Sequence, residues 1–528
     1  MFWADSAIED FIKERKKIID SKESIVIRDE KTPSGRVHIG SMRGVAMHGV
    51  FSRILSEKGI QNTFLYEMND FDAFDAIPEY LDKDKYKTEL GKPLFMLQAP
   101  EGDENYAQYF GKEFARVIEV SGFYPQFYYS SDEYKAGKYN EVIRIALEKA
   151  DAIREIYKEV SGGVREEGWL PIMMICEKCG KISTTRATSF YGEGNGMKVV
   201  YVCDQESSGA VGCGYEGENS PYDGNAKLLW KVDWAAKFRV FDVDIEGEGK
   251  DHATKGGSRD VADRISKEVF KYNPPYDVWY EFFLIGGKKM SSSRGTGVSA
   301  GEVASLIPAK ILQLAILGKA IRRAINFDPN GDTIPILYDQ YDKLSEKYFS
   351  GVEDDDTRLF SLIHEEGDIK SIFLPRFSQV VFLVQMPHMD IEEEVSKIKG
   401  APLTDEDKKE LKERIVYAKQ WIEKYAPERY VFELQLDKVP DNAKSFSSTQ
   451  KRALSLVLEE INKMKELDGQ ELHTTLHNIR KETGIEPKEF FGAIYLAFLG
   501  KESGPKVGWF LSVLDRGFLE NRLEEVSK

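Results

Sequence analysis

Residues 32–44 read TPSGRVHIGSMRG and separate two segments of different periodicity. The preceding run, SIVIRDE at 24–30, is typical of a buried strand end, and the run at 42–59 has its larger apolar residues at helical spacing. A glycine-rich turn from strand to helix presents backbone N–H groups and the positive helix end to an anion. His38 lies in the same turn. The stretch therefore predicts an anion site, although by itself it fits a tight turn that only needs glycine.

The chain around this stretch alternates between strand and helix patterns. We expect strands at 24–30, 62–70, 126–131, 237–247 and 278–287, and helices at 42–59, 104–122 and 140–160. Such alternation favours a parallel sheet with helices on its faces. Amphipathic helix patterns dominate after residue 300, at 405–427, 448–467, 469–484 and 487–500. The sequence predicts an α/β domain followed by a helical one.

Length and composition exclude several classes of protein. The chain has 528 residues, which predicts about three domains, and 41% hydrophobic and 31% charged residues are typical of a globular protein. A formal charge of −16 argues against a protein that coats nucleic acid nonspecifically, but it allows a local basic face. The N-terminal residues lack a signal-peptide pattern and no apolar run is long enough for a membrane helix, so we expect a cytoplasmic protein without membrane contact.

A second motif, GGKKMSSSRGTG at 286–297, follows the last predicted strand. Its flanking glycines predict a loop, and its lysines, arginine and serines supply cations and hydroxyl donors. These groups suit a polyphosphate whose charge moves during a reaction. A solvated basic loop or a phosphorylation target fits the motif by itself equally well. Because both motifs follow strands of one parallel sheet, we expect them to meet at one nucleotide at its carboxyl edge.

The four cysteines lie within 38 residues, at Cys176, Cys179, Cys203 and Cys213. The CEKCG knuckle is a frequent half of a tetrahedral thiolate site, while the second pair has a longer spacing than usual. Clustered cysteines in a large chain without a secretory signal favour a metal over disulfides. We expect one structural Zn²⁺ in an inserted module, with buried free thiols as the alternative.

At these two motifs the chain resembles the class I aminoacyl-tRNA synthetases, because HIGS at 38–41 is similar to their His-Ile-Gly-His motif and KMSSS at 289–293 to their Lys-Met-Ser-Lys-Ser motif. Blocks such as GKDHATKGGSRD at 249–260 and the stretch from LHNIRKETG near the C-terminus extend the resemblance to the class I lysyl-tRNA synthetase family. The chain departs from the class motifs at Ser41 and Ser292, which leaves fewer phosphate contacts. It also lacks Cys and His at 99–110, where many members are understood to carry a further zinc site.

The resemblance implies a fold and an activity. The fold is a Rossmann-like parallel-sheet catalytic domain with a zinc-binding insertion, followed by an all-α anticodon-binding helix cage. The activity is the activation of lysine with ATP and Mg²⁺ and its transfer to the 2′-hydroxyl of the terminal adenosine of tRNA(Lys). We expect neither DNA nor membrane partners. The implied parts are the two halves of the catalytic domain at 1–165 and 226–298, the insertion at 166–225, a stem-contact region at 299–360 and the helical domain at 361–528.

The resemblance also implies site residues. Catalysis is expected from His38, Gly40, Ser41, Lys289, Ser291 and Ser293, and nucleotide binding from these positions together with Pro33, Ser34, Gly35, Lys288, Met290 and Ser292. A carboxylate is needed for the lysine side chain, and the acid-rich end of the strand at 62–70 offers Asp70 and Asp72, with Asp75 nearby. Similarity to the family adds Trp230 and His252 to the lysine pocket, although a tryptophan is on general grounds more often core.

Other functions remain open at this point. Another class I synthetase, such as a glutamyl enzyme, shares both motifs. A nucleotidyltransferase without tRNA shares the histidine motif but does not need the long helical C-terminus. A noncatalytic tRNA-binding paralogue fits the helical domain and the cysteines, and intact His38 and Lys289 argue against it. Trp509, Phe510 and Arg516 lie in a block that resembles the family, where they are either anticodon contacts or core residues.

Overall fold

The computed structural model describes residues 1–528 except 288–297, 366, 368 and 388. The predicted loop residues Lys288, Lys289, Met290, Ser291, Ser292 and Ser293 therefore lie outside the described residues. The chain forms two compact units. Unit 1 comprises Met1–Asp328 with Leu344–Ile369, and unit 2 comprises Pro329–Lys343 with Lys370–Lys528.

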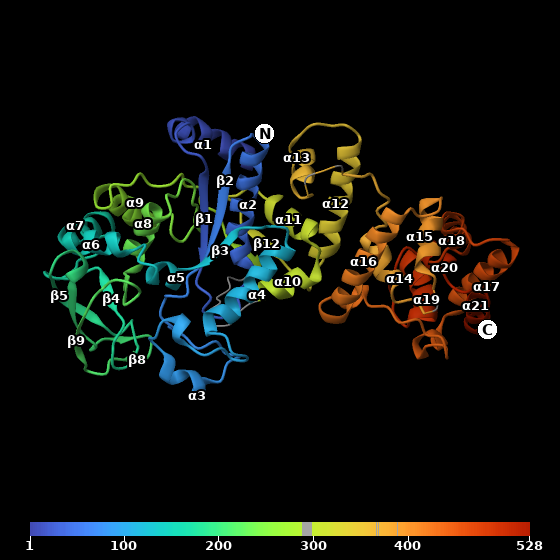
Figure 1. Cartoon of the computed structure of the whole chain (residues 1–528). Helices are drawn as coiled ribbons and strands as arrows, with labels where there is room; N and C mark the ends of the chain where they lie inside the picture. The colour runs from blue at the N-terminus through green and yellow to red at the C-terminus, as the bar shows by residue number, and fades with distance from the viewer. Residues whose placement is uncertain (288–297, 366, 368, 388) are drawn as a thin grey trace. The chain divides into compact units, whose positions relative to one another are not determined.

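Unit 1 is built on a parallel sheet (Figure 1), in the strand order β1–β2–β3. These strands are β1 (Ile25–Lys31), β2 (Asn62–Met68) and β3 (Gln126–Tyr129). Isolated parallel bridges from Ile27 to Ile245 and from Ile245 to Tyr276 extend the sheet beyond β1. The predicted parallel sheet is therefore confirmed, and a segment from beyond the cysteine-rich insertion lies next to its first strand.

Helices cover this sheet because their apolar residues recur with the helical period. In α2 (Met42–Glu57) this face includes Val45, Val50, Phe51 and Ile54, all buried. The remaining helices of unit 1 are α1 (Trp3–Ile19), α3 (Lys83–Tyr86), α4 (Tyr106–Val120), α5 (Ser130–Lys135), α6 (Asn140–Glu148), α7 (Ala150–Ser161), α8 (Trp230–Val240), α9 (Ser258–Glu268), α10 (Ala300–Leu306), α11 (Ala309–Leu317) and α13 (Asp355–Leu362).

Three of the expected elements are corrected. The expected strand at 237–247 begins as the end of α8, because Val232, Ala236 and Phe238 are all buried and burial around the helix masks its period. The expected helix at 140–160 is two helices, α6 and α7, that meet at Lys149. Of the expected strand at 278–287, only β11 (Phe283–Ile285) is a strand, which pairs in parallel with β12 (Ile325–Phe327).

The cysteine-rich insertion forms small antiparallel sheets. β4 (Ile172–Met174) pairs with β10 (Ala226–Leu228), so the insertion leaves and rejoins the α/β part side by side. A three-stranded sheet joins β5 (Arg186–Tyr191), β6 (Lys198–Val202) and β9 (Glu216–Asn219), and a short pair joins β7 (Glu206–Ser207) and β8 (Ala210–Val211).

Unit 2 is helical in the part of the chain that the structure describes. Its helices are α14 (Phe377–Leu383), α15 (Ile391–Lys399), α16 (Asp405–Lys424), α17 (Ser448–Lys463), α18 (Gly469–Thr483), α19 (Pro487–Leu499), α20 (Val507–Ser512) and α21 (Arg516–Ser527). The helix α12 (Thr333–Phe349) runs from this unit into the other. The four helices expected from sequence periodicity correspond to α16, α17, α18 and α19, whose N-termini are fixed by capping residues such as Thr404 and Ser447.

Among the described residues, no single helix is long and apolar enough to cross a membrane. The bent pair α10 and α11 passes a test of length and composition only when both are taken together across a 115° bend.

Candidate active site

A cavity of about 360 Å³ opens beside the carboxyl end of β1. This is the edge of a parallel sheet where ligands of α/β proteins usually bind. Its lining residues come from β1 and the following turn, from α8, from the segment after it and from the approach to β11: Asp29, Glu30, Lys31, Thr32, His38, Gly40, Ser41, Trp230, Trp234, Glu246, Gly247, Glu248, Gly249, Asp251, His252, Tyr280, Glu281, Phe282 and Phe283.

The first motif contributes His38, Gly40 and Ser41 to the cavity wall, at the start of α2. A side chain at position 40 is excluded because its Cβ would lie 2.8 Å from the His38 ring and 3.6 Å from the Phe283 carbonyl oxygen. Gly40 therefore lets the half-buried histidine and the backbone of β11 approach each other. The helix that begins here adds the positive end of its dipole to the site.

The residues on both sides of the second motif lie next to the first motif. Ser299 forms an antiparallel bridge with His38, and the Ala300 N–H donates to the Val37 carbonyl at 2.8 Å. On the other side of the motif, the Gly287 N–H donates to the side-chain oxygen of Asn326 at 2.7 Å. Two segments more than 240 residues apart therefore adjoin at one edge of the sheet.

Three aromatic rings form one wall of the cavity. Trp230 and Trp234 are stacked with their ring centroids 6.2 Å apart, and the His252 ring meets Trp230 edge-on at 5.3 Å. Trp234 is buried, but 44% of Trp230 is exposed. The general expectation that Trp230 is core is thus wrong. An aromatic surface left open to a cavity suits the apolar part of a ligand.

Asp29 presents one carboxylate oxygen without a hydrogen-bond donor among the described residues. Its Oδ1 accepts the Glu30 N–H at 2.8 Å, while the buried Oδ2 accepts no hydrogen bond. The nearest cation-forming group is His48, whose Nδ1 lies 3.4 Å away. That imidazole is held between the Gly44 carbonyl and the Gly247 N–H, each at 2.9 Å, so its Nδ1 carries the proton and its Nε2 accepts. Asp29 can therefore receive a donor from a ligand.

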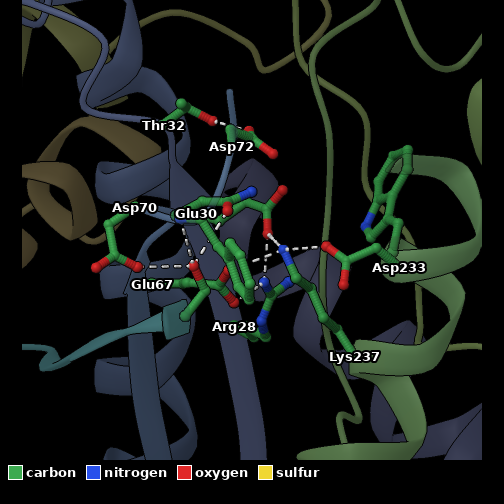
Figure 2. A network of polar contacts seen from close by, with 12 residues as sticks. Arg28, Glu30, Thr32, Glu67, Asp70, Asp72, Asp233 and Lys237 are labelled. Atoms are coloured by element: carbon green, nitrogen blue, oxygen red, sulfur yellow. Dashed lines mark hydrogen bonds and ion pairs between the residues drawn. The ribbon is translucent and has the colours of Figure 1, made fainter. Parts of the chain in front are cut away.

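Glu30 takes part in the buried network of charges in Figure 2. Its Oε2 accepts hydrogen bonds from Arg28 and from Lys237, the latter at 2.7 Å, and its Oε1 receives none from the described residues. Although burial by itself raises the pKa of a carboxyl group, Lys237 and Arg28 hold the pKa of Glu30 far below its usual range. Glu30 is therefore ionised at neutral pH, with one oxygen available to the cavity.

The network extends away from Glu30 through buried ion pairs. It joins three cations to five carboxylates, which leaves a formal excess of two negative charges: Arg28, Lys227 and Lys237 against Glu30, Glu67, Asp72, Asp233 and Glu246. Lys31 is the only lysine or arginine among the described residues that line the cavity, where six carboxylates also lie. The electrostatic balance favours a ligand that carries a positive charge.

The structure does not bring Asp70 or Asp72 into the lining of the cavity. The Asp70 carboxylate accepts the Ser131 N–H at 2.7 Å and hydroxyl groups from Ser130 and Ser131, where it caps the start of α5. Asp72 accepts the Thr32 hydroxyl at 2.6 Å and an ion pair from Lys227. Asp70 thus has a local structural role, and Asp72 reaches the cavity only through Thr32 (Figure 2).

Pro33, Ser34 and Gly35 are buried behind the turn and do not line the cavity. The Ser34 carbonyl accepts the hydroxyl of the buried Tyr106, which fixes the turn against α4. These three residues therefore shape the turn, while the next residues reach the cavity.

Sequence reasoning missed several lining residues, above all Asp29, Glu30, Thr32, Trp234 and Glu246. The strand-end argument applied to Asp70 holds equally for the acids of β1, which directly precede the first motif. Trp234 follows Trp230 at helical spacing, a pattern that was obscured by the expectation of a strand nearby. Glu246 carried no local signal, because its position depends on the bridge between Ile27 and Ile245.

The four cysteines form a cluster that could hold a metal ion, with all four Sγ atoms within 4.8 Å of one another. The Sγ atoms of Cys176 and Cys213 are 3.7 Å apart, and those of Cys179 and Cys203 are 3.8 Å apart. A tetrahedral Zn²⁺ with Zn–S bonds of about 2.3 Å requires S–S separations of about 3.8 Å. The longer spacing of the second cysteine pair is absorbed by the turn between β7 and β8.

Comparisons with known proteins agree with this arrangement. The family model described as "tRNA synthetases class I (K)" matches residues 1–366, and the model described as "Anticodon binding domain" matches residues 385–527. A protein named lysine--tRNA ligase from Methanosarcina barkeri is 34% identical over 99% of this chain and 97% of its own length. Proteins of the same name from Archaeoglobus fulgidus and Pyrococcus horikoshii are each 32% identical over 99% of both chains. The chain belongs to the class I lysyl-tRNA synthetase family.

Proposed function

We propose that this protein is a lysine–tRNA ligase. In the first step a carboxylate oxygen of lysine attacks the α-phosphorus of ATP, and the bond to the β-phosphate breaks to release pyrophosphate. In the second step the 2′-hydroxyl of the terminal adenosine of tRNA(Lys) attacks the activated carbonyl carbon, and AMP leaves. Neither step needs a nucleophile from the protein, so positioning and charge stabilisation supply the catalysis.

The observation that carries this proposal is the combination of an aromatic wall with unpaired carboxylate oxygens in one cavity. The methylene groups of a lysine side chain would pack against Trp230, and an ammonium group would donate to Asp29 Oδ2 or Glu30 Oε1. The excess of carboxylates opposes an acidic amino acid such as glutamate, which would bury a further negative charge. The same cavity therefore favours lysine over the substrate of a glutamyl enzyme.

The nucleotide would occupy the side of the cavity formed by His38, Gly40 and Ser41. His38 would donate to the phosphate chain, and Gly40 would let the backbone approach it. Lys289, Ser291 and Ser293, with Lys288, would bind the β- and γ-phosphates from the loop that begins and ends beside this turn. Mg²⁺ bound to ATP would neutralise part of the phosphate charge.

The cysteine cluster would hold one structural Zn²⁺. Its S–S separations fit a tetrahedral thiolate site, and four protein ligands leave no position for a reacting water. Residues 99–110 contain neither Cys nor His, so we propose one zinc ion rather than two. Metal analysis of the purified protein should give one Zn²⁺ per chain, and its loss on Cys176→Ser would support the assignment. A metal-free protein with unchanged stability would overturn it.

The C-terminal unit would bind the anticodon of the tRNA, and the region 299–360 would contact the acceptor stem. The match to an anticodon-binding domain supports the first assignment. Both assume an enzyme that acts on tRNA in the cytoplasm.

The test is ATP–pyrophosphate exchange with each of the twenty amino acids, with and without tRNA, followed by charging of purified tRNA(Lys). We expect exchange and charging that depend on lysine and that are lost on Lys289→Ala, with Lys310→Ala as a control outside the motif. Exchange that depends on glutamate would favour the glutamyl alternative. Binding of tRNA without exchange or charging under any of these conditions would favour a noncatalytic paralogue.

A further inference from the structure

A second cavity, of about 780 Å³, lies within unit 2 and has no part in the amino-acid site. Its walls come from α14, α15, the turn before α18, and the helices α18, α20 and α21: Gln379, Glu394, Lys397, Ile398, Lys465, Glu466, Leu467, Asp468, Gly469, Gln470, Lys506, Trp509, Ser512 and Arg516. Its volume falls within the range of small-ligand sites. We call it the Trp509 groove.

Trp509 gives this groove a flat apolar surface. The next residue, Phe510, is fully buried, whereas Trp509 is only half-buried and lines the groove. The edge of its ring rests on Phe382 at 5.0 Å, and the indole N–H donates to no described residue. The ring is thus held in place by the core while one part of it remains open.

Close backbone packing keeps the groove from being filled by the protein itself. A Cβ at Gly469 would lie 3.1 Å from Trp509 Cα, and a Cβ at Gly508 would lie 2.4 Å from the Gly469 carbonyl oxygen. The two glycines allow the start of α18 to pack directly on α20. The indole is therefore placed at the base of a preformed site, which lowers the entropic cost of binding.

The charge of the groove differs from that of the whole chain. Four cations, Lys397, Lys465, Lys506 and Arg516, face three carboxylates, although the protein as a whole carries a formal charge of −16. Lys397 and Arg516 pair with glutamates of their own helices, while the exposed Lys465 and Lys506 form no ion pair among the described residues. Two uncommitted lysines beside an open indole match a ligand with a planar ring and an anionic backbone.

We infer that the Trp509 groove binds an unpaired nucleobase of the tRNA, stacked on the indole, with the flanking phosphates near Lys465 and Lys506. This inference rests on the proposed function and names the residues through which unit 2 would hold single-stranded RNA. Stacking on an aromatic ring is the usual way in which proteins bind unpaired bases. An acidic protein segment would use the lysines but would not need the flat ring.

The test measures binding of tRNA(Lys) to the full-length protein, by filter retention at fixed salt concentration. We expect Trp509→Ala to weaken binding roughly 5- to 150-fold, the range for loss of one stacked base, and Trp509→Phe to restore most of it. Phe491→Ala, a half-buried aromatic residue of α19 outside the groove, is the matched control and should bind as the wild type does. Wild-type affinity in Trp509→Ala would overturn the inference.

A second measurement does not depend on the folding of that variant. A tRNA anticodon-loop RNA carrying the fluorescent base 2-aminopurine is titrated with the wild-type protein and with Lys506→Ala and Lys488→Ala. We expect quenching on binding, a weaker titration with Lys506→Ala and no change with Lys488→Ala, which is exposed on α19 outside the groove. Binding without quenching at any loop position, or displacement of the RNA by polyglutamate alone, would overturn base stacking.

The two proposals fail in distinguishable ways. A wild-type protein that does not charge tRNA with lysine would overturn the proposed function. A wild-type protein that charges tRNA, together with a Trp509→Ala variant of unchanged kcat/KM for tRNA, would overturn the groove alone.

Discussion

The ends of β1 and β2 are neighbours in one parallel sheet, and both carry acidic residues, yet their carboxylates have different surroundings. At β1, Asp29 Oδ2 receives no hydrogen bond from the described residues. At β2, Asp70 receives three hydrogen bonds at the start of α5, and Asp72 is occupied by Thr32 and Lys227. An acidic strand end is thus not a binding site by itself. The number of protein donors within reach decides whether a carboxylate is available to a ligand.

The network around Glu30 combines both situations. Arg28 and Lys237 bind one oxygen of Glu30 and keep the group ionised, while its other oxygen is left without a donor among the described residues (Figure 2). Buried ion pairs of this kind contribute little net stability when complete, but they are costly to break because an unpaired charge remains. Their role at this site is to fix the position and charge of a carboxylate.

The largest effect is expected from Lys237→Met, which removes the cation shared by Glu30, Glu67 and Asp233. The free energy of unfolding at pH 7 should fall by about 3–5 kcal/mol, because three buried carboxylates lose their partner. Urea denaturation followed by tryptophan fluorescence measures this change. The control is Lys231→Met, on the same helix and without an ion pair to any described residue, which should change the value by less than about 1 kcal/mol. Equal values for the two variants would contradict the proposed role of the network.

The pH dependence of the same variant sharpens this prediction. Because the pKa of Glu30 is lowered in the folded protein, its contribution to stability is present above its unfolded pKa of about 4.3 and is lost as the pH falls toward the folded pKa. The stability difference between wild type and Lys237→Met should therefore be larger at pH 7 than at pH 4. A difference that grows on acidification would show that Lys237 acts through another group.

Asp29→Asn tests the open carboxylate at the end of β1. We expect kcat/KM for lysine in ATP–pyrophosphate exchange to fall about 100-fold, equivalent to about 2.7 kcal/mol, because a donor from the substrate loses its charged acceptor. The KM for ATP should change less than about threefold. A kcat/KM for lysine within threefold of the wild-type value would transfer the recognition of the ammonium group to Glu30 or another lining acid.

Asp72→Asn is expected to have a smaller effect, since Asp72 acts through the Thr32 hydroxyl. With that hydroxyl proton donated to Asp72, the Thr32 oxygen can only accept from a ligand. The kcat/KM for lysine should fall about tenfold, or about 1.4 kcal/mol. Thr32→Val should give a similar loss, and the double variant should lose little more than either single variant. Additive losses would show that the two residues act independently.

Asp70→Asn should have the smallest effect. Its carboxyl group is buried and its pKa is raised by that burial, so an amide preserves much of its environment. Stability should fall by about 1 kcal/mol or less, and kcat/KM for lysine should stay within twofold of the wild-type value. A loss comparable to that of Asp29→Asn would remove the distinction between the two strand ends and restore the sequence-based prediction for Asp70.

Local sequence patterns determined the elements that surround the site. The strand, the glycine turn and the helix of the first motif could be predicted because their residues are contiguous, and His38, Gly40 and Ser41 do lie on one cavity wall. The cysteine cluster was also predictable, because thiols gathered in a short segment have few alternatives to meeting one another. The two lysine-rich and serine-rich residues of greatest interest, Lys289 and Ser291, lie outside the described residues, so their roles stay predictions.

Tertiary structure alone decided which polar groups have partners and which face the cavity. Glu246, bound by Arg28 and Trp234, reaches the site through a bridge between positions more than 200 residues apart, and no local period encodes that contact. Trp230 is open to the cavity although its residue type favours burial. The sequence by itself therefore determined the elements, since propensity and spacing act over a few residues. The availability of each carboxylate was decided by the fold, because hydrogen-bond donors from distant segments compete for the same oxygens.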